Sequence, residues 1–501
     1  MTDTDVIVVG AGPTGLMLAA ELRLAGVRTL VLERRPRIND VARAGGLGGQ
    51  ILHVLRYRGL LERFEAASGR PRPTPRFPFG GLEADFTRLA DPPMEAPLLP
   101  QPQIEAVLEE YVRDAGADVR RGHEVVGLAD DPASVTVDVD GPGGRYRVTA
   151  RHVAGCDGAR SRMRDLAGIP FPGITYPEVN RLAHVARPAS VTLREDGDYE
   201  IPGIGSLPAG YTQTERGVFA IASMTQDELT IYTSEDDPGR YDDDTPMTVT
   251  ELAASIRRVL GADVPLGEPT RMTRFTYHAR HAENYRAGRV LLAGDAAHQF
   301  PAGGVAVNAG MLDAVNLGWK LAADIAGWAP QGLLDTYHDE RHRAGARTLL
   351  HTQAQVALRR GADPAAEALR ELVGELLLDA QPLHRIGRLL AGDDITYPTH
   401  GVGRHPLTGT FLPDLPLHLH TGRPVFLDLA DRSDLCAAAR GWSHRADILT
   451  ARTDQRPADA LVVRPDGYIA WAAGVDEAIG TAGPPLLAAL TDWFGAPRDG
   501  A

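Results

Sequence analysis

Hydrophobic positions recur along this chain with the two periods expected of buried strands and helices. Val6–Val9 forms a continuous apolar run that predicts a buried strand. Residues 16–25 carry apolar side chains at helical spacing, and residues 29–32 form a second apolar run. The pattern therefore predicts a strand, a helix and a second strand, and the second strand is followed by Glu33.

The segment that follows, up to about residue 170, mixes helical and strand-like stretches around a proline-rich connector, residues 70–102. A turn is indicated by Gly141-Pro142-Gly143-Gly144. In chain order we expect helices over 51–67 and 104–115, a strand opening at Val119, an antiparallel meander of 125–128, 135–139 and 146–150, and a strand at Val153–Ala154 that returns to the first sheet.

From residue 171 to about 270 short alternating runs dominate, which predicts a mostly antiparallel sheet. The acidic tract 235–244 is expected to be a solvated loop. Some apolar side chains here are candidates for lining an apolar substrate cavity, and a place in the sheet core is equally compatible, because alternate residues face opposite sides. These candidates are Leu207, Tyr211, Phe219, Ile221 and Met224.

The chain then returns to a buried-type strand at 289–293, followed by Gly294 and Asp295 and a long helix over 311–326. Further helix is expected from residue 333 to about 390. The last part, about 408–498, predicts a small α/β unit. Its expected elements are strands at 424–429, 460–463 and 468–472 and a closing helix at 486–494.

Composition narrows the classes of protein. The net charge is −14 over 501 residues without a basic block, so nucleic acid and anionic membranes are poor partners. Cys156 and Cys436 are the only cysteines, which excludes a disulfide framework or a thiolate metal site and suits a reducing cytoplasm. With no room for a signal peptide before Asp5 and no long apolar run, we expect a cytoplasmic location.

Three distant motifs are each suited to holding one large anionic dinucleotide. The first is G-x-G-x-x-G at residues 10–15, which directly follows a strand and opens a helix, with an acid about 20 residues on. Glycines there allow backbone amides to approach a pyrophosphate at a helix N-terminus. The other two motifs are Gly155-Cys156-Asp157-Gly158-Ala159-Arg160-Ser161 and Gly294-Asp295-Ala296-Ala297-His298.

With these motifs in this order, the chain resembles the class A flavoprotein aromatic hydroxylases, the group around para-hydroxybenzoate hydroxylase. Within that group it is most similar to the aromatic-polyketide hydroxylases and rifampicin monooxygenase. The similarity continues through residues 313–320, 337–341 and 461–471. It implies an α/β fold with a Rossmann-like FAD-binding domain (1–170 and 271–400), an inserted antiparallel substrate domain (171–270) and a thioredoxin-like C-terminal domain (408–498).

The resemblance also implies roles for individual residues. Asp157 belongs to a motif that serves both FAD and NAD(P)H, and Asp295 would bond to the ribityl or pyrophosphate region of FAD. Alternatives from the residues alone are a simple turn for Asp157, a solvated side chain for Arg160 and a backbone-satisfied structural role for His298, which we favour. The implied cofactor-binding residues are Gly10, Gly12, Gly15, Glu33, Arg34, Arg43, Gln101, Asp157, Asp295, Pro301, Gly304 and Asn308, with Pro301, Gly303 and Gly304 forming the flavin loop.

Two departures from the family pattern bear on the reaction subtype. At the flavin loop the family commonly has Gly-Gly-Gln-Gly-Leu-Asn, and this chain has Ala306 where that pattern has its last glycine. A Cβ there could shift the backbone's approach to the flavin. Gly48 and Gln50 stand where many polyketide members carry a histidine and an arginine, so a charge is lost and room is expected to be gained.

The function implied is hydroxylation of a polycyclic aromatic substrate of polyketide type through a C4a-hydroperoxyflavin, with O₂ and NADPH or NADH as co-substrates. We expect no metal site and no protein nucleophile, because the cofactor carries the chemistry. A Baeyer–Villiger or ring-cleaving reaction and a catalytically silent binding protein remain alternatives, and a homodimer is left open. The C-terminal unit lacks Cys-x-x-Cys, so dithiol exchange is excluded and a structural or association role is expected.

Overall fold

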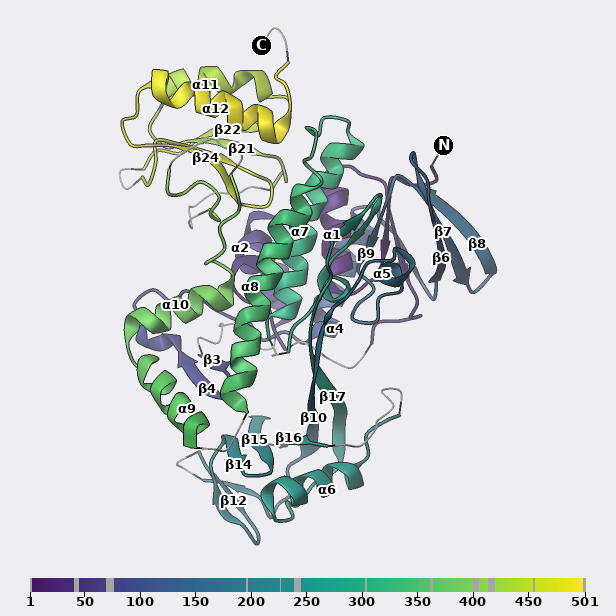
Figure 1. Cartoon of the computed structure of the whole chain (residues 1–501), viewed down its shortest axis with the longest axis vertical. Helices are drawn as coiled ribbons and strands as arrows, with labels where there is room; N and C mark the ends of the chain where they lie inside the picture. Colours follow the sequence, from purple (N-terminus) through teal and green to yellow (C-terminus); the bar gives the residue numbers. More distant parts are fainter. Residues whose placement is uncertain are drawn as a thin grey trace.

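The computed structural model describes residues 2–39, 45–68, 76–194, 197–225, 227–237, 245–301, 304–360, 364–399, 405–412, 420–453 and 456–498. Its long axis runs from the C-terminal α/β unit, past two long helices, to an antiparallel sheet at the opposite end (Figure 1). The small meander projects to one side, near the N-terminus.

The first sheet has six strands in the order β18-β19-β9-β1-β2-β5, and every pair is parallel except β18 with β19. The central strands β1 and β9 are fully buried, and β1 is apolar throughout, as predicted. Apolar residues of the small meander, such as Val137 and Val139, belong to the same core cluster as these strands. The strands are β1 (Val6–Val9), β2 (Thr29–Glu33), β5 (Asp118–Arg121), β9 (His152–Gly155), β18 (Arg286–Ala287) and β19 (Val290–Leu292).

Helix α1 packs against α7 and α4 on one side of this sheet. Gly318 allows α7 to come close, since a Cβ there would lie 2.6 Å from the Cβ of Glu21 on α1. The helices of this region are α1 (Pro13–Leu24), α2 (Gln50–Tyr57), α3 (Leu61–Ala67), α4 (Gln101–Asp114), α5 (Arg162–Leu166), α7 (Ala306–Ile325) and α8 (Thr336–Arg359).

Several predicted helix boundaries were wrong. The helix expected over 51–67 is two helices, α2 and α3, because Gly59 between them adopts a left-handed φ of 67°. Helix α7 starts at Ala306, five residues before its predicted start. The helical stretch expected over 333–390 is divided into α8, α9 (Pro364–Leu376) and α10 (Ala380–Ala391). The expected connector also contains structure, namely β3 (Arg76–Phe79), β4 (Leu82–Asp85) and η1 (Phe86–Arg88).

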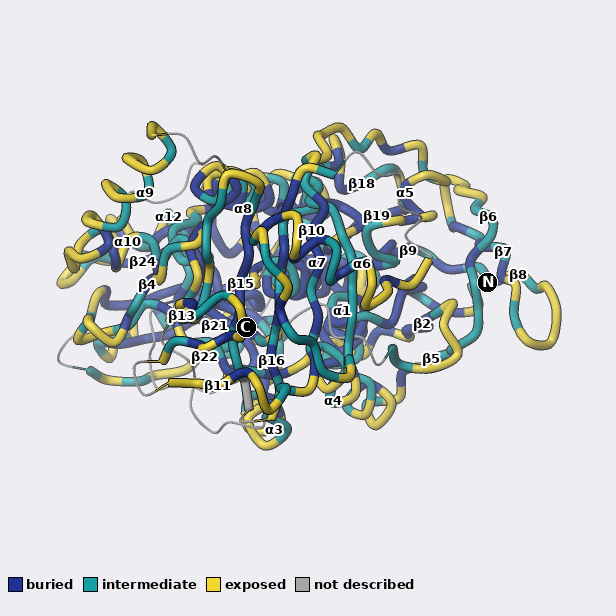
Figure 2. Tube along the Cα trace, turned by 90° about the horizontal axis from the view of Figure 1, so that it is seen from below, coloured by how far each residue is buried: buried dark blue, intermediate teal, exposed yellow. Residues whose placement is uncertain are grey.

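The predicted meander is confirmed as a three-stranded antiparallel sheet of β6 (Glu124–Asp130), β7 (Val135–Gly141) and β8 (Gly144–Ala150). Buried residues gather around the first sheet and α7, whereas α9 and the β7–β8 turn are largely exposed (Figure 2).

The second six-stranded sheet is antiparallel, in the order β14-β15-β16-β10-β17-β20. Helix α6 (Val249–Leu260) and the short strands β11 (Thr192–Leu193), β12 (Tyr199–Ile201) and β13 (Gly205–Leu207) lie beside it. The six strands are β10 (Gly173–Ala186), β14 (Gly210–Thr214), β15 (Gly217–Thr225), β16 (Glu228–Asp236), β17 (Pro269–His281) and β20 (His298–Gln299).

The prediction of a solvated loop from residue 235 was wrong at its start. Glu235 belongs to β16 and is only 5% exposed. Its carboxylate is buried because Arg181, Arg258 and the hydroxyl of Ser255 donate to it. The acidic composition of residues 235–244 predicted exposure to solvent, but ion pairs with Arg181 and Arg258 stabilise the Glu235 carboxylate in a buried position. Residues 238–244 lie outside the described residues.

The C-terminal unit has a four-stranded sheet in the order β22-β21-β23-β24, with β21 and β22 parallel and the other pairs antiparallel. This order and direction match the expected thioredoxin-like arrangement. Helix α12 begins earlier than predicted, since Pro484 and Pro485 lie inside it. The elements are β21 (Val425–Asp428), α11 (Ser433–Ala439), η3 (Arg440–Trp442), β22 (Asp447–Thr450), β23 (Ala460–Val463), β24 (Ile469–Ala473) and α12 (Ile479–Phe494).

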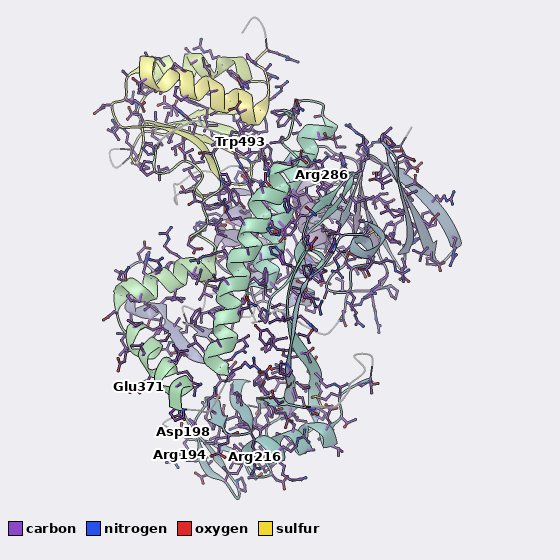
Figure 3. All side chains as sticks on the ribbon, in the orientation of Figure 1. Arg194, Asp198, Arg216, Arg286, Glu371 and Trp493 are labelled. Carbon is purple, nitrogen blue, oxygen red and sulfur yellow. The ribbon has the colours of Figure 1, made fainter. Side chains whose placement is uncertain are left out.

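A buried interface joins this unit to α7 and α8. Trp493 lies where the C-terminal helices meet the end of α7 (Figure 3), and its ring centroid is 6.3 Å from that of Trp319. The Arg464 guanidinium stacks over the Trp493 ring at 4.3 Å. The C-terminal unit is therefore held against α7, the helix whose first residues, Ala306 and Val307, line a cavity at the edge of the first sheet.

Candidate functional site

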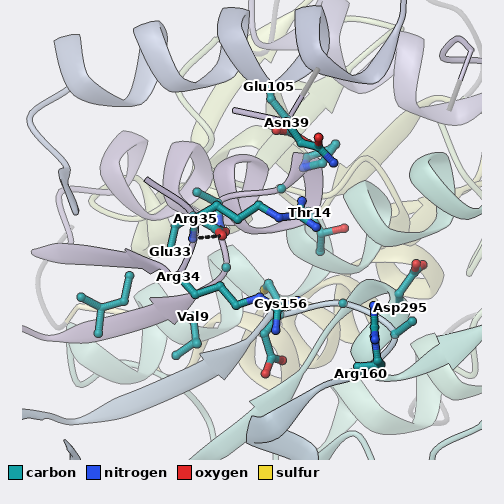
Figure 4. Close-up of a pocket in the computed structure, with 18 of the residues that line it drawn as sticks. Val9, Thr14, Glu33, Arg34, Arg35, Asn39, Glu105, Cys156, Arg160 and Asp295 are labelled. Atoms are coloured by element: carbon teal, nitrogen blue, oxygen red, sulfur yellow. Dashed lines mark hydrogen bonds between the residues drawn. The ribbon is translucent and has the colours of Figure 1, made fainter. Parts of the chain in front are cut away.

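A cavity of about 520 Å³ opens at the carboxyl ends of β1, β2 and β9 (Figure 4). All three sequence motifs reach it, although they lie more than a hundred residues apart. Of the residues predicted to bind a cofactor, those that line the cavity are Gly10, Gly12, Glu33, Arg34, Gln101, Asp157 and Asp295.

The turn between β1 and α1 has the shape of a phosphate cradle. Gly10 adopts φ 106°, and a Cβ there would lie 2.3 Å from the Cys156 carbonyl oxygen. A Cβ at Gly15 would lie 2.0 Å from the Gly10 oxygen, whereas one at Gly12 would meet no atom within 4 Å and would occupy the cavity itself. The N-terminus of α1 at Gly12 has no side-chain cap, so an anion fits against its open amides.

Glu33 ends β2 at the wall of the cavity, where two backbone amides fix its carboxylate. Ala11 N donates to Oε2 at 2.8 Å, and Arg35 N donates to Oε1 at 2.9 Å, the contact drawn in Figure 4. Arg34 lines the cavity beside it. Gln101 opens α4 on another wall and donates to Glu105 at 2.7 Å.

Asp157 lines the cavity, but its carboxylate bonds within its own loop. Ser161 Oγ donates to Oδ1 at 2.5 Å, and Met163 N donates to Oδ2 at 3.0 Å. Burial raises the pKa of this carboxyl. Its side chain therefore shapes the loop that presents Gly158 and Arg160 to the cavity.

The turn Gly294–Asp295 follows β19 and presents Asp295 to the cavity from the side opposite Glu33 (Figure 4). Asp313 on α7 holds this turn, since its Oδ2 accepts from Gly294 N at 3.0 Å and from His298 Nε2 at 2.7 Å. Its Oδ1 accepts from Arg341 Nε at 2.7 Å. Burial raises the pKa of Asp313, but the charges of Arg341 and His298 outweigh burial and lower it.

The sequence analysis assigned Asp313 no role, although an acid inside an apolar helical stretch is a signal of a buried contact. The structural role favoured for His298 holds, because this side chain is buried and bonded. Its partner is the Asp313 carboxylate and not the backbone.

The predicted flavin loop borders the N-terminus of α7. Asn308 connects it to residues 45–50: its Oδ1 accepts from Gly48 N and its Nδ2 donates to Gly304 O, both at 3.1 Å. Pro301, Gly304, Asn308 and Gly15 do not line the cavity, whereas Ala306 and Val307 do. Arg43 and Gly303 lie outside the described residues.

The room expected at Gly48 is not present. A Cβ there would lie 2.9 Å from Met94 Cε and 3.1 Å from the Glu95 carbonyl oxygen, so the connector already fills this space. Gln50 is buried and accepts from the Tyr468 hydroxyl at 3.4 Å, toward the C-terminal unit. Neither departure leaves an open space where the family's histidine and arginine stand.

Most of the candidate substrate-lining residues are core residues. Leu207, Phe219 and Ile221 pack in one cluster with Leu252 and other residues of α6. Tyr211 lies on the opposite face and is 43% exposed. The side chain of Met224 lies outside the described residues. A cavity on this sheet must therefore form on the Tyr211 face.

Comparison with protein families gives two matches. Residues 3–352 match the model described as "FAD binding domain", and residues 405–497 match "Aromatic-ring hydroxylase, C-terminal". The chain belongs to the FAD-binding aromatic-ring hydroxylases. It is accordingly a flavin-dependent monooxygenase with FAD as its cofactor and a reduced nicotinamide as co-substrate.

Similarity to named enzymes extends over nearly the whole chain. The chain is 40% identical to 12-dehydrotetracycline 5-monooxygenase/anhydrotetracycline 6-monooxygenase of Streptomyces rimosus, with 98% of this chain and 99% of the relative covered. It is 37% identical to rifampicin monooxygenase of Streptomyces venezuelae (99% and 100% covered) and 36% identical to dialkyldecalin synthase of Streptomyces rugosporus (99% of both).

Among solved structures, the chain superposes on CabE, an aromatic hydroxylase from angucycline biosynthesis. The TM-score is 0.85 at 39% identity, and 99% of this chain and 100% of CabE are covered. Among the described residues no group of three or more metal-ligating side chains occurs. The helices of the described part are also too short or too polar to cross a membrane.

Proposed function

We propose that this chain hydroxylates a polycyclic aromatic substrate of polyketide type in secondary metabolism. The observation that carries the proposal is the single cavity in which the glycine turn, Glu33, the Asp157 loop and the Gly294–Asp295 turn meet, in a chain similar over its full length to anhydrotetracycline monooxygenase. FAD bound in this cavity would supply the redox chemistry, namely hydride uptake from NAD(P)H and transfer of an oxygen atom from O₂ to an aromatic carbon.

Each wall of the cavity fits one part of FAD. Gly10, Gly12 and Gly15 would cradle the pyrophosphate at the α1 N-terminus. Glu33, fixed by two amides, would accept from the adenosine ribose, with Arg34 beside it. The remaining residues proposed to contact the cofactor are Arg43, Gln101, Asp157 and Asp295, together with Pro301, Gly303, Gly304 and Asn308 of the flavin loop.

The N-terminus of α7 directly follows the proposed flavin loop, and it would favour negative charge on that side of the cavity. Its first residue is Ala306, and its N-cap, Val305, offers no side-chain acceptor. The open amides of the first turn carry the positive end of a 20-residue helix dipole. They would therefore stabilise negative charge on reduced flavin, the charge that develops during turnover.

The sequence boundaries also remain a proposal: an FAD-binding domain of 1–170 and 271–400, a substrate domain of 171–270 and a C-terminal domain of 408–498. The family models support the C-terminal boundary, since the second model covers 405–497. The first model runs through both the FAD-binding and the substrate segments, from 3 to 352, so the division between those two rests on the separate six-stranded sheets.

Two alternatives have specific support. Similarity to rifampicin monooxygenase keeps a Baeyer–Villiger or ring-cleaving outcome open. Similarity to dialkyldecalin synthase, at nearly the same identity, supports a synthase reaction that forms a decalin product in place of hydroxylation. The FAD cavity is compatible with all three, so the products must distinguish them.

The deciding experiment offers the purified protein, loaded with FAD, a panel of polycyclic phenols that includes anhydrotetracycline, with NADPH or NADH under ¹⁸O₂. We expect a yellow protein, substrate-stimulated NAD(P)H oxidation and one ¹⁸O atom on a ring carbon of the product. Oxygen inserted between two carbons would establish the Baeyer–Villiger alternative. Substrate conversion without ¹⁸O uptake or NAD(P)H consumption would refute the proposed hydroxylation and favour the synthase alternative.

A further inference from the structure

The two faces of the antiparallel sheet differ in chemistry. One face packs on α6 with Phe219, Ile221 and Ile231. The opposite face carries Tyr211 and Tyr232, whose ring centroids are 6.0 Å apart. Asn180 lies on this face too, since the Tyr232 hydroxyl donates to its Oδ1 at 2.5 Å. Phe275 on β17 pairs with Asn180, and Tyr277, two residues further along the same strand, points to the same side of the sheet. This tyrosine face turns toward the end of α8, which descends onto β14–β16 in Figure 1.

Arg359, the last residue of α8, reaches across to the tyrosine face. Its Nη1 donates to the Tyr277 hydroxyl at 3.0 Å, and its guanidinium carbon lies 4.8 Å from the centroid of that ring. Its Nη2 points to the Pro301 carbonyl oxygen at 3.4 Å. Arg359 therefore lies between the tyrosine face and the flavin loop.

The charge of Arg359 is not balanced by a carboxylate. Three other arginines of this region form ion pairs. On α8 itself, Arg341 is paired with Asp313 and Arg347 with Asp394, and directly after α8, Arg360 is paired with Glu178. Among the described residues, no carboxylate oxygen lies within 4.0 Å of the Arg359 guanidinium nitrogens. A half-buried cation with only neutral oxygen partners favours an anion.

The nearby phenols do not supply that anion. Burial raises the pKa of both Tyr211 and Tyr232, so they stay neutral at physiological pH. Beside them is a cavity of about 420 Å³. Arg359 shares its lining with Val218, Tyr232, Tyr277 and Val356. The same cavity is also lined by the carboxylates of Glu178, Glu215, Glu235 and Asp236 and by Arg216 and Arg360, of which Glu178 is paired with Arg360 and Glu235 with Arg181 and Arg258. Beside the Arg359 guanidinium itself the wall is aromatic and aliphatic, formed by Tyr277, Tyr232 and Val356. This part of the cavity suits a flat aromatic ligand that carries an ionised oxygen.

We propose that Arg359, oriented by Tyr277, binds an ionised phenol or enol oxygen of the aromatic substrate and so selects acidic polycyclic phenols. This inference rests on the proposed function, whose substrate class it narrows. An ionised oxygen raises electron density at the ortho and para carbons of its ring, the carbons that an electrophilic oxygen attacks. The guanidinium stays charged at any working pH and gives up no proton, so it selects the phenolate without neutralising it.

The test compares two ligands and four proteins, all loaded with FAD. The ligands are alizarin, at a pH where its 2-hydroxyl is ionised, and its 2-methyl ether, and binding is read as the change in the flavin absorbance spectrum. The proteins are the wild type, Arg359→Gln, Arg359→Lys and the control Arg343→Gln, which removes the same charge from an exposed position of α8. The FAD dissociation constant is measured for every protein.

We expect Arg359→Gln to weaken alizarin binding about 10–100-fold, the loss of one charge-assisted hydrogen bond, while the methyl ether binds the variant and the wild type alike. Arg359→Lys should recover part of the affinity, and Arg343→Gln should match the wild type. Unchanged FAD affinity in Arg359→Gln places the loss in the substrate site and not in a disturbed Pro301 loop.

The outcomes separate the two proposals. If the wild type binds alizarin and its ether equally, or if Arg359→Gln binds alizarin as the wild type does, Arg359 selects no anion and the proposed function is untouched. If FAD-loaded wild type binds neither ligand and oxidises no NAD(P)H with any polycyclic phenol, the proposed substrate class is wrong, and this inference with it. A raised FAD dissociation constant in Arg359→Gln, equal to the alizarin effect, would make Arg359 a support of the flavin loop only.

Discussion

The guanidinium of Arg464, just after β23, donates to both carboxylate oxygens of Glu340 on α8, at 2.5 Å and 2.7 Å. Lys320 on α7 donates to the same carboxylate at 2.7 Å. All three side chains are at most 2% exposed. Burial raises the pKa of Glu340, but Arg464 and Lys320 outweigh burial and lower it to about 2. The C-terminal unit is thus bound to α7 and α8 by a fully charged buried cluster.

Removing one member of this cluster should be costly. We expect Arg464→Met to lower the free energy of unfolding by about 3–5 kcal/mol, because Glu340 then keeps Lys320 as its only charged partner in this cluster and the buried carboxylate of Asp466 loses its arginine. Urea unfolding measures the loss. The matched control is Arg147→Met, whose partner is Asp138 on an exposed hairpin with the arginine side chain 78% exposed, and it should change stability by less than about 0.5 kcal/mol. Equal small effects in both variants would contradict a stabilising role for the buried cluster.

A methyl group at Gly12 should reduce FAD affinity without unfolding the protein. Its Cβ meets no protein atom, so the fold tolerates it, yet it enters the space proposed for the pyrophosphate. We expect Gly12→Ala to weaken FAD binding roughly 10–100-fold, as for the loss of one hydrogen bond to a charged group, measured by calorimetry on the apoprotein. Gly480→Ala, which also meets no atom and lies on α12, should bind FAD as the wild type does. Undiminished affinity in Gly12→Ala would place the pyrophosphate elsewhere.

Stability should fall in acid well before the carboxylates protonate. Burial, together with neighbouring histidines, lowers the pKa of His281 to about 3, and burial lowers that of His351 to about 4. Both are neutral in the folded protein, while the unfolded chain takes up protons near the ordinary value of 6.5. The contribution of these two histidines to the free energy of unfolding should therefore be constant above about pH 7 and decline below about 6.5, approaching about 1.4 kcal/mol per pH unit for each histidine.

The measurement is urea unfolding across this pH range for the wild type and His351→Gln. The variant removes one buried histidine and should show a smaller slope between the ordinary histidine pKa and about 4. An identical slope in both proteins would show that His351 does not titrate on unfolding.

Cys436 should be dispensable for activity. Its thiol donates to Asp428 Oδ2 at 3.4 Å, and burial, with that carboxylate, raises its pKa to about 11, so the reactive thiolate is scarce. The other cysteine, Cys156, is buried beside the β1–α1 turn. We expect Cys436→Ser to keep wild-type NAD(P)H oxidation rates with or without reductant. If Cys436→Ser lost most of the NAD(P)H oxidation rate both with and without reductant, this thiol would have a chemical role.

The sequence predicted the features that depend on local pattern. The β1 run, the glycines of the first turn and Glu33 follow one another within a strand–helix–strand unit, so spacing alone placed them together. The Gly294–Asp295 turn was found because it also follows a buried strand. These positions are set by backbone geometry, which short-range sequence encodes.

What the sequence missed depends on partners distant along the chain. Asp313 acquires its role only because α7 lies beside the Gly294 turn, and Glu235 is buried only because Arg181 and Arg258 meet it. Gly48 suggested an open space that Met94 fills from a connector expected to be irregular. Side-chain pairings between elements follow from tertiary packing, and a single sequence carries no periodic signal for them.

The contact between Asp313 and the Gly294 turn yields the last prediction. Asp313→Asn keeps the size of the side chain but removes the charge that Arg341 and His298 face in a fully buried site. The Asp313 carboxylate accepts from three donors through its two oxygens, whereas an asparagine side chain has one oxygen acceptor and one NH₂ donor. Either Gly294 N or the Arg341 guanidinium therefore loses its acceptor in the variant. We expect a loss of about 3–5 kcal/mol in the free energy of unfolding, together with weaker FAD binding, because the turn that presents Asp295 is released.

FAD titration of Asp313→Asn beside Asp295→Asn separates the two effects, since Asp295→Asn changes the cavity while leaving the buried cluster intact. Full FAD affinity in Asp313→Asn would show that the turn holds its shape without this carboxylate.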